Sequence, residues 1–353
     1  MNELQKTTKA HMLTPAETSR AVLFREVANR EINDTVTPDF FLSHYMDFVR
    51  MVIANGQPST DTYNTYKAGI ESFLGWCLKY ARVNPFILKE KHLELYRDWL
   101  YKSKTVNGTD YSKSTVYNRL VAIRAFYHAA VKQKIITENP CLDVKSPSVA
   151  INDLPFSYFK MDQIGKITRY VRKNFDEFEC YRNLACIYLM AVGGLRCVEV
   201  HRANQEDINW NDFTMLVHGK GHNGIIYLDE YTGNILKEYI DCVIRQPFAV
   251  KKEGENTPLI ISNATNNSGK RLARNSIRWN MNRVLEGAGF KQKGAACHIF
   301  RHSCATALYK TTHDLRVVQD VLRHRNPNVT ARYAHVVEQL QNRPTNALGK
   351  MID

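Results

Sequence analysis

The sequence has no apolar run that approaches the length of a membrane span, and its first residues, Met-Asn-Glu-Leu-Gln-Lys, do not begin a signal sequence. It also contains no internal repeat and no low-complexity tract. These absences argue against a membrane, secreted or repeat protein and predict a cytoplasmic globular chain. Because its 353 residues exceed the usual size of one domain, we expect two.

Paired metal-binding cysteines are also missing. None of the eight cysteines belongs to a Cys-x-x-Cys pair, and most lie within apolar stretches. Buried free thiols in a reducing compartment therefore explain them better than a disulfide framework or a zinc site. These residues are Cys77, Cys141, Cys180, Cys186, Cys197, Cys242, Cys297 and Cys304.

Acidic residues are too few to balance the basic ones. The chain has 48 Lys and Arg against 35 Asp and Glu, which leaves a formal net charge of +13. A surplus of this size favours a polyanionic partner, because neutralising phosphates releases their condensed counterions. A basic enzyme with an unrelated substrate remains the alternative. An anionic membrane is disfavoured, since no lysine-rich amphipathic stripe flanked by aromatics is found.

Residues 38–134 carry apolar side chains at helical spacing throughout. The pattern predicts a first helix near the start of this range, a second after an N-cap at Ser59, a third over Glu90–Ser103 and a fourth from about Ser112. We expect a compact all-α domain. The predicted inward faces are Phe41, Tyr45, Phe48 and Val52; Tyr63, Tyr66, Ile70, Phe73, Leu74 and Cys77; Leu93, Tyr96 and Leu100; and Val116, Leu120, Ile123, Phe126 and Tyr127.

A break follows this helical region. Asn139-Pro140 and Lys145-Ser146-Pro147-Ser148 combine helix-stopping prolines with small polar residues, as interdomain linkers do. Beyond it the chain should be helical except for one hairpin, Thr214–Val217 and Ile225–Leu228, around a glycine-rich turn. The predicted division is a polar extension over 1–37 with one helix (Pro15–Arg30), a helical domain over 38–139, a linker over 140–154 and a second domain over 155–353.

Basic and nucleophilic side chains recur along the second domain, at Arg196, Lys220, His298, Arg301, His324 and Tyr333. The planar fork of arginine holds two phosphate oxygens at once, and histidine and lysine can move protons. Neither an acidic cluster that could hold a catalytic metal nor a P-loop accompanies them. The set points to phosphoryl transfer to a tyrosine without metal, nucleotide or other cofactor. Its motifs are Gly-Gly-Leu-Arg-Cys-Val-Glu (193–199), His-Gly-Lys-Gly (218–221), His-Ile-Phe-Arg-His (298–302), Leu-Arg-His (322–324) and Arg-Tyr-Ala-His (332–335).

Single members of this set also have plainer interpretations. Arg196 could form a structural ion pair with Glu199 or Glu206. Lys220 could be a solvated lysine of the turn. The spacing His-x-x-Arg of His298 and Arg301 puts both on one helix face but is common by itself.

Tyr333 is one of 18 tyrosines, and only the residues near it in the sequence mark it as the candidate nucleophile. His324 lies nine residues upstream, and the helix stop Asn326-Pro327 between them would let the tyrosine fold back toward the histidine. Such help matters, because the ordinary tyrosine pKa of about 10 leaves the hydroxyl protonated at neutral pH. Nearby cations favour the phenolate, and a neutral histidine can accept the proton.

Together the order and spacing of these motifs resemble the tyrosine recombinase (phage integrase) family. Gly-Leu-Arg-Cys-Val-Glu is similar to its first arginine box and His-Ile-Phe-Arg-His-Ser-Cys-Ala-Thr to its second. Leu-Arg-His and Tyr-Ala-His, with eight residues between them, are similar to its nucleophile box. The resemblance implies a mainly α fold. In that fold a helical (SAM-like) core-binding domain precedes an α-rich catalytic domain with a small β-hairpin or sheet.

The resemblance also implies a site-specific DNA recombinase. Arg196 and Arg301 would clamp the scissile phosphate and stabilise its transition state. Tyr333 would attack the phosphorus and form a 3′-phosphotyrosyl link. Because the bond energy is kept in this ester, strand joining would need no ATP.

The remaining three residues would move protons or orient the phosphate. By the same resemblance, Lys220 would protonate the departing 5′ oxygen, and His298 would serve in acid–base chemistry on the tyrosine side. His324 would hydrogen-bond the phosphate.

Two positions depart from the family pattern. Arg323 stands where a glycine usually precedes the histidine of the nucleophile box, and Asn223-Gly224-Ile225 replaces a basic residue that often follows the hairpin lysine. Neither departure removes a chemical group from the site. They bear on the local geometry at His324 and on the hairpin's contacts with DNA.

A type IB topoisomerase and a non-catalytic DNA-binding protein are the alternatives to a recombinase. For the recombinase, integration and excision of a mobile element is the first interpretation and resolution of replicon dimers the second. Expected partners are double-stranded DNA with paired half-sites, further copies of the chain in a tetrameric synapse and accessory DNA-bending proteins. The protein would be associated with the nucleoid.

Two surfaces are expected to serve assembly on DNA. Lys113, Ser114, Asn118 and Arg119 lie off the apolar face at the start of the fourth helix, and we expect this face to enter the major groove. A plain solvated face is the alternative. The tail, residues 336–353, carries scattered apolar side chains and is expected to dock on a neighbouring copy of the chain, with docking on its own domain as the alternative.

Overall fold

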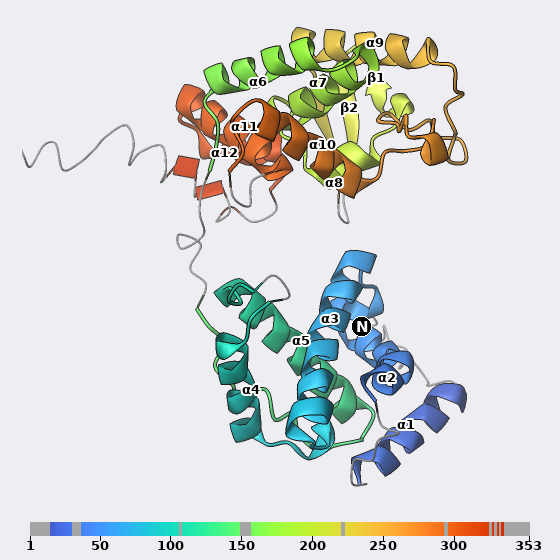
Figure 1. Ribbon diagram of the computed structural model, residues 1–353, viewed down its shortest axis with the longest axis vertical. Helices are drawn as coiled ribbons and strands as arrows, with labels where there is room; N and C mark the ends of the chain where they lie inside the picture. Colours follow the sequence, from blue (N-terminus) through green and yellow to red (C-terminus); the bar gives the residue numbers. More distant parts are fainter. Residues whose placement is uncertain are drawn as a thin grey trace, which may run out of the picture. The chain divides into compact units, whose positions relative to one another are not determined.

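The computed structural model describes residues 15–29, 37–105, 108–148, 157–219, 223–292 and 296–324, together with residues 327, 330–331 and 333–334. The chain divides into two compact units on either side of the boundary between Asp153 and Leu154. Both units are rich in helix (Figure 1). Within the described ranges, no helix combines the length and the apolar character that crossing a bilayer would require.

The first unit is built of helices, and capping side chains mark the starts of α2, α3 and α5. Thr37, Ser59 and Ser112 each accept a hydrogen bond from the backbone N–H three residues on, which satisfies one of the free donors of a helix start. The predicted N-cap at Ser59 and the predicted helix start at Ser112 are thereby confirmed. The helices are α1 (Pro15–Ala28), α2 (Pro38–Val52), α3 (Thr60–Gly75), which continues as a π-helical turn over Trp76–Ala81, α4 (Glu90–Lys102) and α5 (Lys113–Lys132).

An aromatic cluster fills the centre of the first unit. The rings of Phe86 and Phe126 stack with their centroids 5.6 Å apart. Tyr45 and Tyr127 are buried and donate their hydroxyls to backbone carbonyls, each at 2.7 Å, so the polar end of each ring is satisfied. The predicted inward faces are buried, apart from three half-buried members, Val52, Tyr63 and Tyr66.

Residues beyond the predicted limits of the helical domain take part in this core. Phe24 of α1 is fully buried, and its ring centroid lies 5.1 Å from that of Tyr45. Cys141 and Val144, in the predicted linker, are buried too, and Arg124 of α5 donates to their carbonyl oxygens at 3.1 and 2.6 Å. The packed unit thus includes part of the predicted extension and the first residues of the predicted linker.

The second unit combines helices with a small antiparallel sheet in the order β1-β2-β3. The predicted hairpin is confirmed, since β2 (Thr214–His218) pairs with β3 (Asn223–Tyr227) along their whole length. The sequence pattern does not predict β1 (Ile208–Asn209), because two residues are too few to show an alternation. The helices are α6 (Met161–Asn174), α7 (Glu177–Ala191), α8 (Cys197–Arg202), α9 (Glu230–Ile244), α10 (Arg274–Gly287), α11 (Cys297–Thr312) and α12 (Leu315–Leu322).

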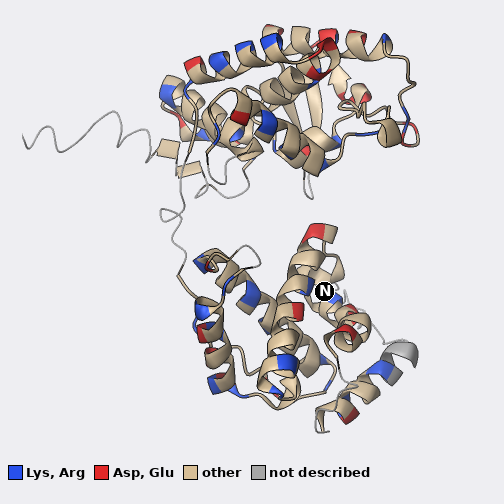
Figure 2. Ribbon diagram, in the orientation of Figure 1, with Lys and Arg blue, Asp and Glu red and all other residues tan. Residues whose placement is uncertain are grey.

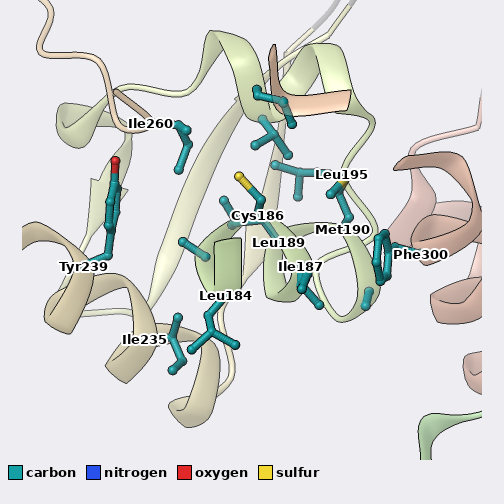
Figure 3. Packing of buried hydrophobic residues seen from close by; sticks show 14 of the residues in the cluster. Leu184, Cys186, Ile187, Leu189, Met190, Leu195, Ile235, Tyr239, Ile260 and Phe300 are labelled. Carbon is teal, nitrogen blue, oxygen red and sulfur yellow. The ribbon is translucent and has the colours of Figure 1, made fainter. Parts of the chain in front are cut away.

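Helix α7 lies at the centre of the second unit. Its Leu184, Cys186, Ile187 and Leu189 are buried on different sides of the helix, among residues of the neighbouring segments (Figure 3). A helix that is apolar on all sides must be covered on all sides. The elements around α7 include α8, which Arg196 precedes as N-cap residue, and α11, which carries Arg301, so this core holds the site in place.

All eight cysteines are free and buried, as their apolar surroundings predict. The mainly α architecture, with one small sheet in the second unit, confirms the expected fold class.

Candidate active site

Arg196 is positioned by the glycine turn at the end of α7. Gly194 has a φ of +65°, and a Cβ there would lie 2.8 Å from a methyl carbon of Leu322, so this turn requires glycine. Arg196 then begins α8, where its backbone N–H donates to Oε2 of Glu199 and its guanidinium to Oε1, both at 2.8 Å. The ion pair of the plainer interpretation is therefore present. Even so, the side chain of Arg196 is 33% exposed and accessible to a ligand.

Arg301, on α11, contacts the glycine turn that precedes Arg196. Its side chain is buried and donates to the carbonyl oxygens of Gly194 and, at 2.5 Å, of Leu322. Burial and the neighbouring cation of Arg196 lower the pKa of Arg301 to about 10, which still leaves it charged at neutral pH. The two carbonyls hold the guanidinium against the turn that precedes Arg196.

Glu199 lies at the centre of a cluster of arginines. Its buried carboxylate is 2.8 Å from Arg196, 3.0 Å from Arg323 and 3.7 Å from Arg301. Burial by itself would raise the pKa of Glu199, but the N–H of Arg196 and the charges of Arg323 and Arg301 outweigh it and lower the pKa below its ordinary value. Three guanidinium groups against one carboxylate leave an excess of two positive charges, which suits a phosphate.

Tyr333 is buried next to this cluster. Its hydroxyl lies 3.0 Å from Nδ1 of His302, and its ring stacks on that of His324, with centroids 6.3 Å apart and an interplanar angle of 12°. Tyr333 also belongs to the same buried apolar cluster as Leu322, whose carbonyl oxygen accepts a hydrogen bond from Arg301. The structure therefore brings the predicted nucleophile to a histidine and to the arginines.

His302 is a residue that the sequence analysis did not single out. It follows Arg301 directly and lies one helical turn after His298, with the two histidine ring centroids 6.4 Å apart. The pattern His-x-x-Arg-His, with its two histidines four residues apart on a helix, could have drawn attention to it.

His324 is buried and held by Thr330, whose Oγ1 lies 2.9 Å from its Nδ1. Burial, together with the charges of Arg301 and Arg196, lowers the pKa of His324 to about 4. The imidazole is therefore neutral at pH 7 and can donate one hydrogen bond without adding charge.

His298 lies on the first turn of α11 with an exposed side chain. Desolvation by the surrounding protein atoms and the charges of Arg301 and Arg196 lower its pKa, so it belongs to the same electrostatic site. The hydroxyl of Tyr333 forms a hydrogen bond with His302, the next histidine on α11.

Lys220 lies outside the described residues, but the hairpin on either side of it is described. His218, the last residue of β2, places its Nε2 2.7 Å from Oδ1 of Asp207. Arg202 of α8 donates to the carbonyl oxygen of Gly219 at 2.9 Å. The hairpin is thus tied at its end to the helix that Arg196 begins.

The candidate groove-binding residues lie on the first turns of α5. Lys113 and Asn118 are exposed and Ser114 is half-buried. Arg119 instead packs over the ring of Tyr111, 4.9 Å from its centroid, and donates to the carbonyl oxygen of Ala68 on α3 at 3.4 Å. Lys and Arg occur on helices of both units, including α5 and α6 (Figure 2).

Comparison with known proteins gives the same assignment for both units. The chain matches the Phage integrase family over residues 157–339 and the Phage integrase SAM-like domain over residues 41–145. One relative is the tyrosine recombinase XerC of Thermodesulfovibrio yellowstonii, which is 26% identical over 301 residues, 84% of this chain and 92% of the relative.

Solved structures share the fold. The site-specific recombinase XerH, bound to a palindromic difH substrate, has a TM-score of 0.68 at 19% identity and covers 96% of each chain. The Tn1549 transposon integrase, in complex with circular intermediate DNA, has a TM-score of 0.59 at 15% identity over 81% of this chain and 93% of that one. Because the Phage integrase family match extends over more than half of its length, this chain belongs to the phage integrase family.

Proposed function

We propose that the protein is a site-specific DNA recombinase that cleaves and rejoins DNA through a 3′-phosphotyrosyl intermediate at Tyr333. The observation that carries this proposal is the environment of Tyr333. Its hydroxyl lies 3.0 Å from a histidine nitrogen, and its ring is buried in the same apolar cluster as Leu322, whose carbonyl oxygen accepts a hydrogen bond from Arg301. A DNA phosphate held by the arginines would meet this nucleophile, and the positive charge would stabilise the five-coordinate transition state.

The proposed cleavage forms one bond and breaks one. The oxygen of Tyr333 attacks the phosphorus while Arg196 and Arg301 hold two of its oxygens, and the bond from phosphorus to the 5′ oxygen breaks. Lys220 supplies the proton of the leaving 5′ hydroxyl. Rejoining is the reverse reaction with a 5′ hydroxyl of another strand, so it consumes no ATP and calls for no added metal. Undiminished cleavage in EDTA is the corresponding expectation.

We assign the tyrosine proton to His302 rather than to His298. A general base must lie within about 2.6–3.2 Å of the proton donor, and the separation between His302 and Tyr333 meets this requirement. His298, being exposed beside the arginines, is suited to contact the bound DNA. His324, neutral and stacked on Tyr333, is suited to donate a hydrogen bond to the phosphate.

The proposed partner is double-stranded DNA with paired half-sites, bound by copies of the chain that assemble into a tetrameric synapse. The XerH structure supports paired sites, since the DNA bound in it is palindromic. Accessory DNA-bending proteins and docking of the tail on a neighbouring copy belong to the same proposal. The tail, residues 336–353, lies outside the described residues.

For the biological role we propose integration and excision of a mobile element, which the similarity in fold to a transposon integrase supports. Resolution of replicon dimers is the second candidate, because the same strand exchange between two sites on a dimeric circle would separate it. Sequencing the DNA trapped on the protein distinguishes them: one role predicts the ends of an element, the other a single site of a circular replicon.

Replacing the nucleophile tests the proposal directly. Tyr333→Phe should abolish the covalent adduct with a nicked suicide substrate while leaving DNA binding nearly unchanged, because only one hydroxyl is lost. Tyr309→Phe is the matched control, since this tyrosine is buried in the same apolar cluster. A normal adduct yield with Tyr333→Phe would refute the assignment, and loss of the adduct with Tyr309→Phe would redirect it.

A further inference from the structure

Arg323 ends α12 in a backbone conformation that favours glycine. Its φ is 55° and its ψ is 47°, in the left-handed region where a Cβ is strained. Its N–H donates to the carbonyl oxygen of Asp320 at 3.0 Å and so caps the helix, a task that glycine performs without strain. The side chain, rather than the backbone, must therefore account for an arginine at this position.

The side chain of Arg323 is 9% exposed and reaches the carboxylate that holds Arg196. Its Nη2 donates to Oε2 of Glu199 at 3.0 Å and its Nη1 to the carbonyl oxygen of Val321 at 2.8 Å. Its Nε is buried and has no hydrogen-bond partner among the described residues. A buried donor left unpaired costs stability, so stability alone does not explain the residue either.

The aliphatic part of the Arg323 side chain passes β3 at Gly224, which is the one glycine of the two paired strands β2 and β3. A Cβ on Gly224 would lie 2.6 Å from Cδ of Arg323 and 3.4 Å from its Cγ. Gly224 belongs to β3, opposite Val217 of β2, and Lys220 falls between these two strands in the sequence. The two departures from the family pattern, Arg323 and Gly224, thus fit each other.

We propose that Arg323 is a positioning residue that joins the two ends of the cleavage site. Through Glu199 it orients Arg196 on the phosphate side, and through Gly224 it holds the hairpin so that Lys220 reaches the leaving oxygen. The inference rests on the proposed function and adds to it a residue that acts through Glu199 and Gly224. It also gives a reason for an arginine at a position where glycine is less strained.

The two contacts make separable contributions. Glu199 shares its charge among three arginines, and removing the Arg323 guanidinium reduces the positive excess from two charges to one. The contact with Gly224 is steric and carries no charge. A variant that disturbs only the hairpin should therefore affect proton delivery to the leaving group, whereas one that removes the guanidinium should affect phosphate binding in the transition state.

Two variants separate these effects. Gly224→Ala keeps every charge but pushes the stem of Arg323 away from β3. Arg323→Met keeps a stem of similar length but removes the guanidinium. Gly165→Ala in α6 is the matched control, because a Cβ there meets only the flexible end of Arg169, at 3.7 Å. Melting temperature and DNA affinity, measured for each full-length variant, show whether it folds and binds.

The readout is the single-turnover cleavage rate on two DNA substrates, ordinary DNA and DNA with a sulfur in place of the leaving 5′ oxygen. A thiolate leaves without a proton, because thiols are far more acidic than alcohols. Gly224→Ala should slow cleavage of ordinary DNA roughly 10- to 100-fold, as a displaced catalytic group does, and cleave the sulfur substrate at nearly the wild-type rate. Arg323→Met should slow both substrates, each by roughly 10-fold or more.

A third variant keeps the test decisive. Arg323→Gly removes the side chain with which the added methyl group of Gly224→Ala would clash. The double variant Arg323→Gly/Gly224→Ala should therefore cleave no more slowly than Arg323→Gly alone. Gly224→Ala slowed equally on both substrates, or slowed on neither, would overturn the hairpin contact, and full activity of Arg323→Met would overturn the contact with Glu199. These outcomes compare variants with the wild type, whereas failure of the wild type to form an adduct would count against the proposed function itself.

Discussion

The contact between His302 and Tyr333 leads to the most direct prediction about the chemistry. Replacing His302 by phenylalanine keeps a ring of similar size against Tyr333 but removes the nitrogen that lies 3.0 Å from the hydroxyl. Tyr333 is 2% exposed, so bulk water does not readily take the place of that nitrogen. Loss of a positioned general base costs roughly 10²- to 10⁴-fold, and we expect His302→Phe to slow covalent adduct formation by about this factor.

The assay is single-turnover adduct formation on a nicked suicide substrate, measured across pH. The deficit of His302→Phe should shrink as the pH rises toward about 10, the ordinary pKa of tyrosine, because hydroxide then replaces the missing base. His298→Phe, one turn earlier on α11, is the comparison and should keep a pH dependence like that of the wild type. If His298→Phe shows the pH-dependent deficit and His302→Phe does not, the assignment of His302 is wrong.

Three further predictions follow from the site and from the first unit. Arg196→Ala and Arg301→Ala should each slow cleavage by roughly 10²- to 10³-fold while weakening DNA binding far less; equal losses in both measurements would contradict a role in the transition state. His324 has its pKa lowered from 6.5 to about 4, so between these values the unfolded chain binds a proton that the folded chain does not, and stability falls as the pH drops through this window. His324→Gln should lose this part of the acid sensitivity, measured as melting temperature against pH, and an unchanged pH profile would count against it. Asn118→Ala, on an exposed position of α5, should weaken site preference on DNA with little change in stability, and unaltered affinity, salt dependence and preference would refute the major-groove assignment.

Much of the local structure was determined by the sequence itself. Ser59 and Ser112 cap helices as predicted, and the spacing of Leu93, Tyr96 and Leu100 identified a buried face. Capping and helical periodicity depend on residues within about four positions of one another, so a single sequence contains the required information. The chemical types in the motifs, arginine, histidine and tyrosine, likewise indicated phosphoryl transfer before any geometry was known.

The tertiary structure alone decided which of these groups meet. Tyr333 contacts His302, 31 residues earlier in the chain, and no pattern distinguishes this histidine from His298 as its partner. Glu199 is shared by arginines from three separate segments, and Arg323 is accommodated because Gly224 lacks a side chain. Such contacts depend on how α8, α11, α12 and the hairpin pack around the apolar core of the second unit, and that packing is set by the whole unit rather than by neighbouring residues.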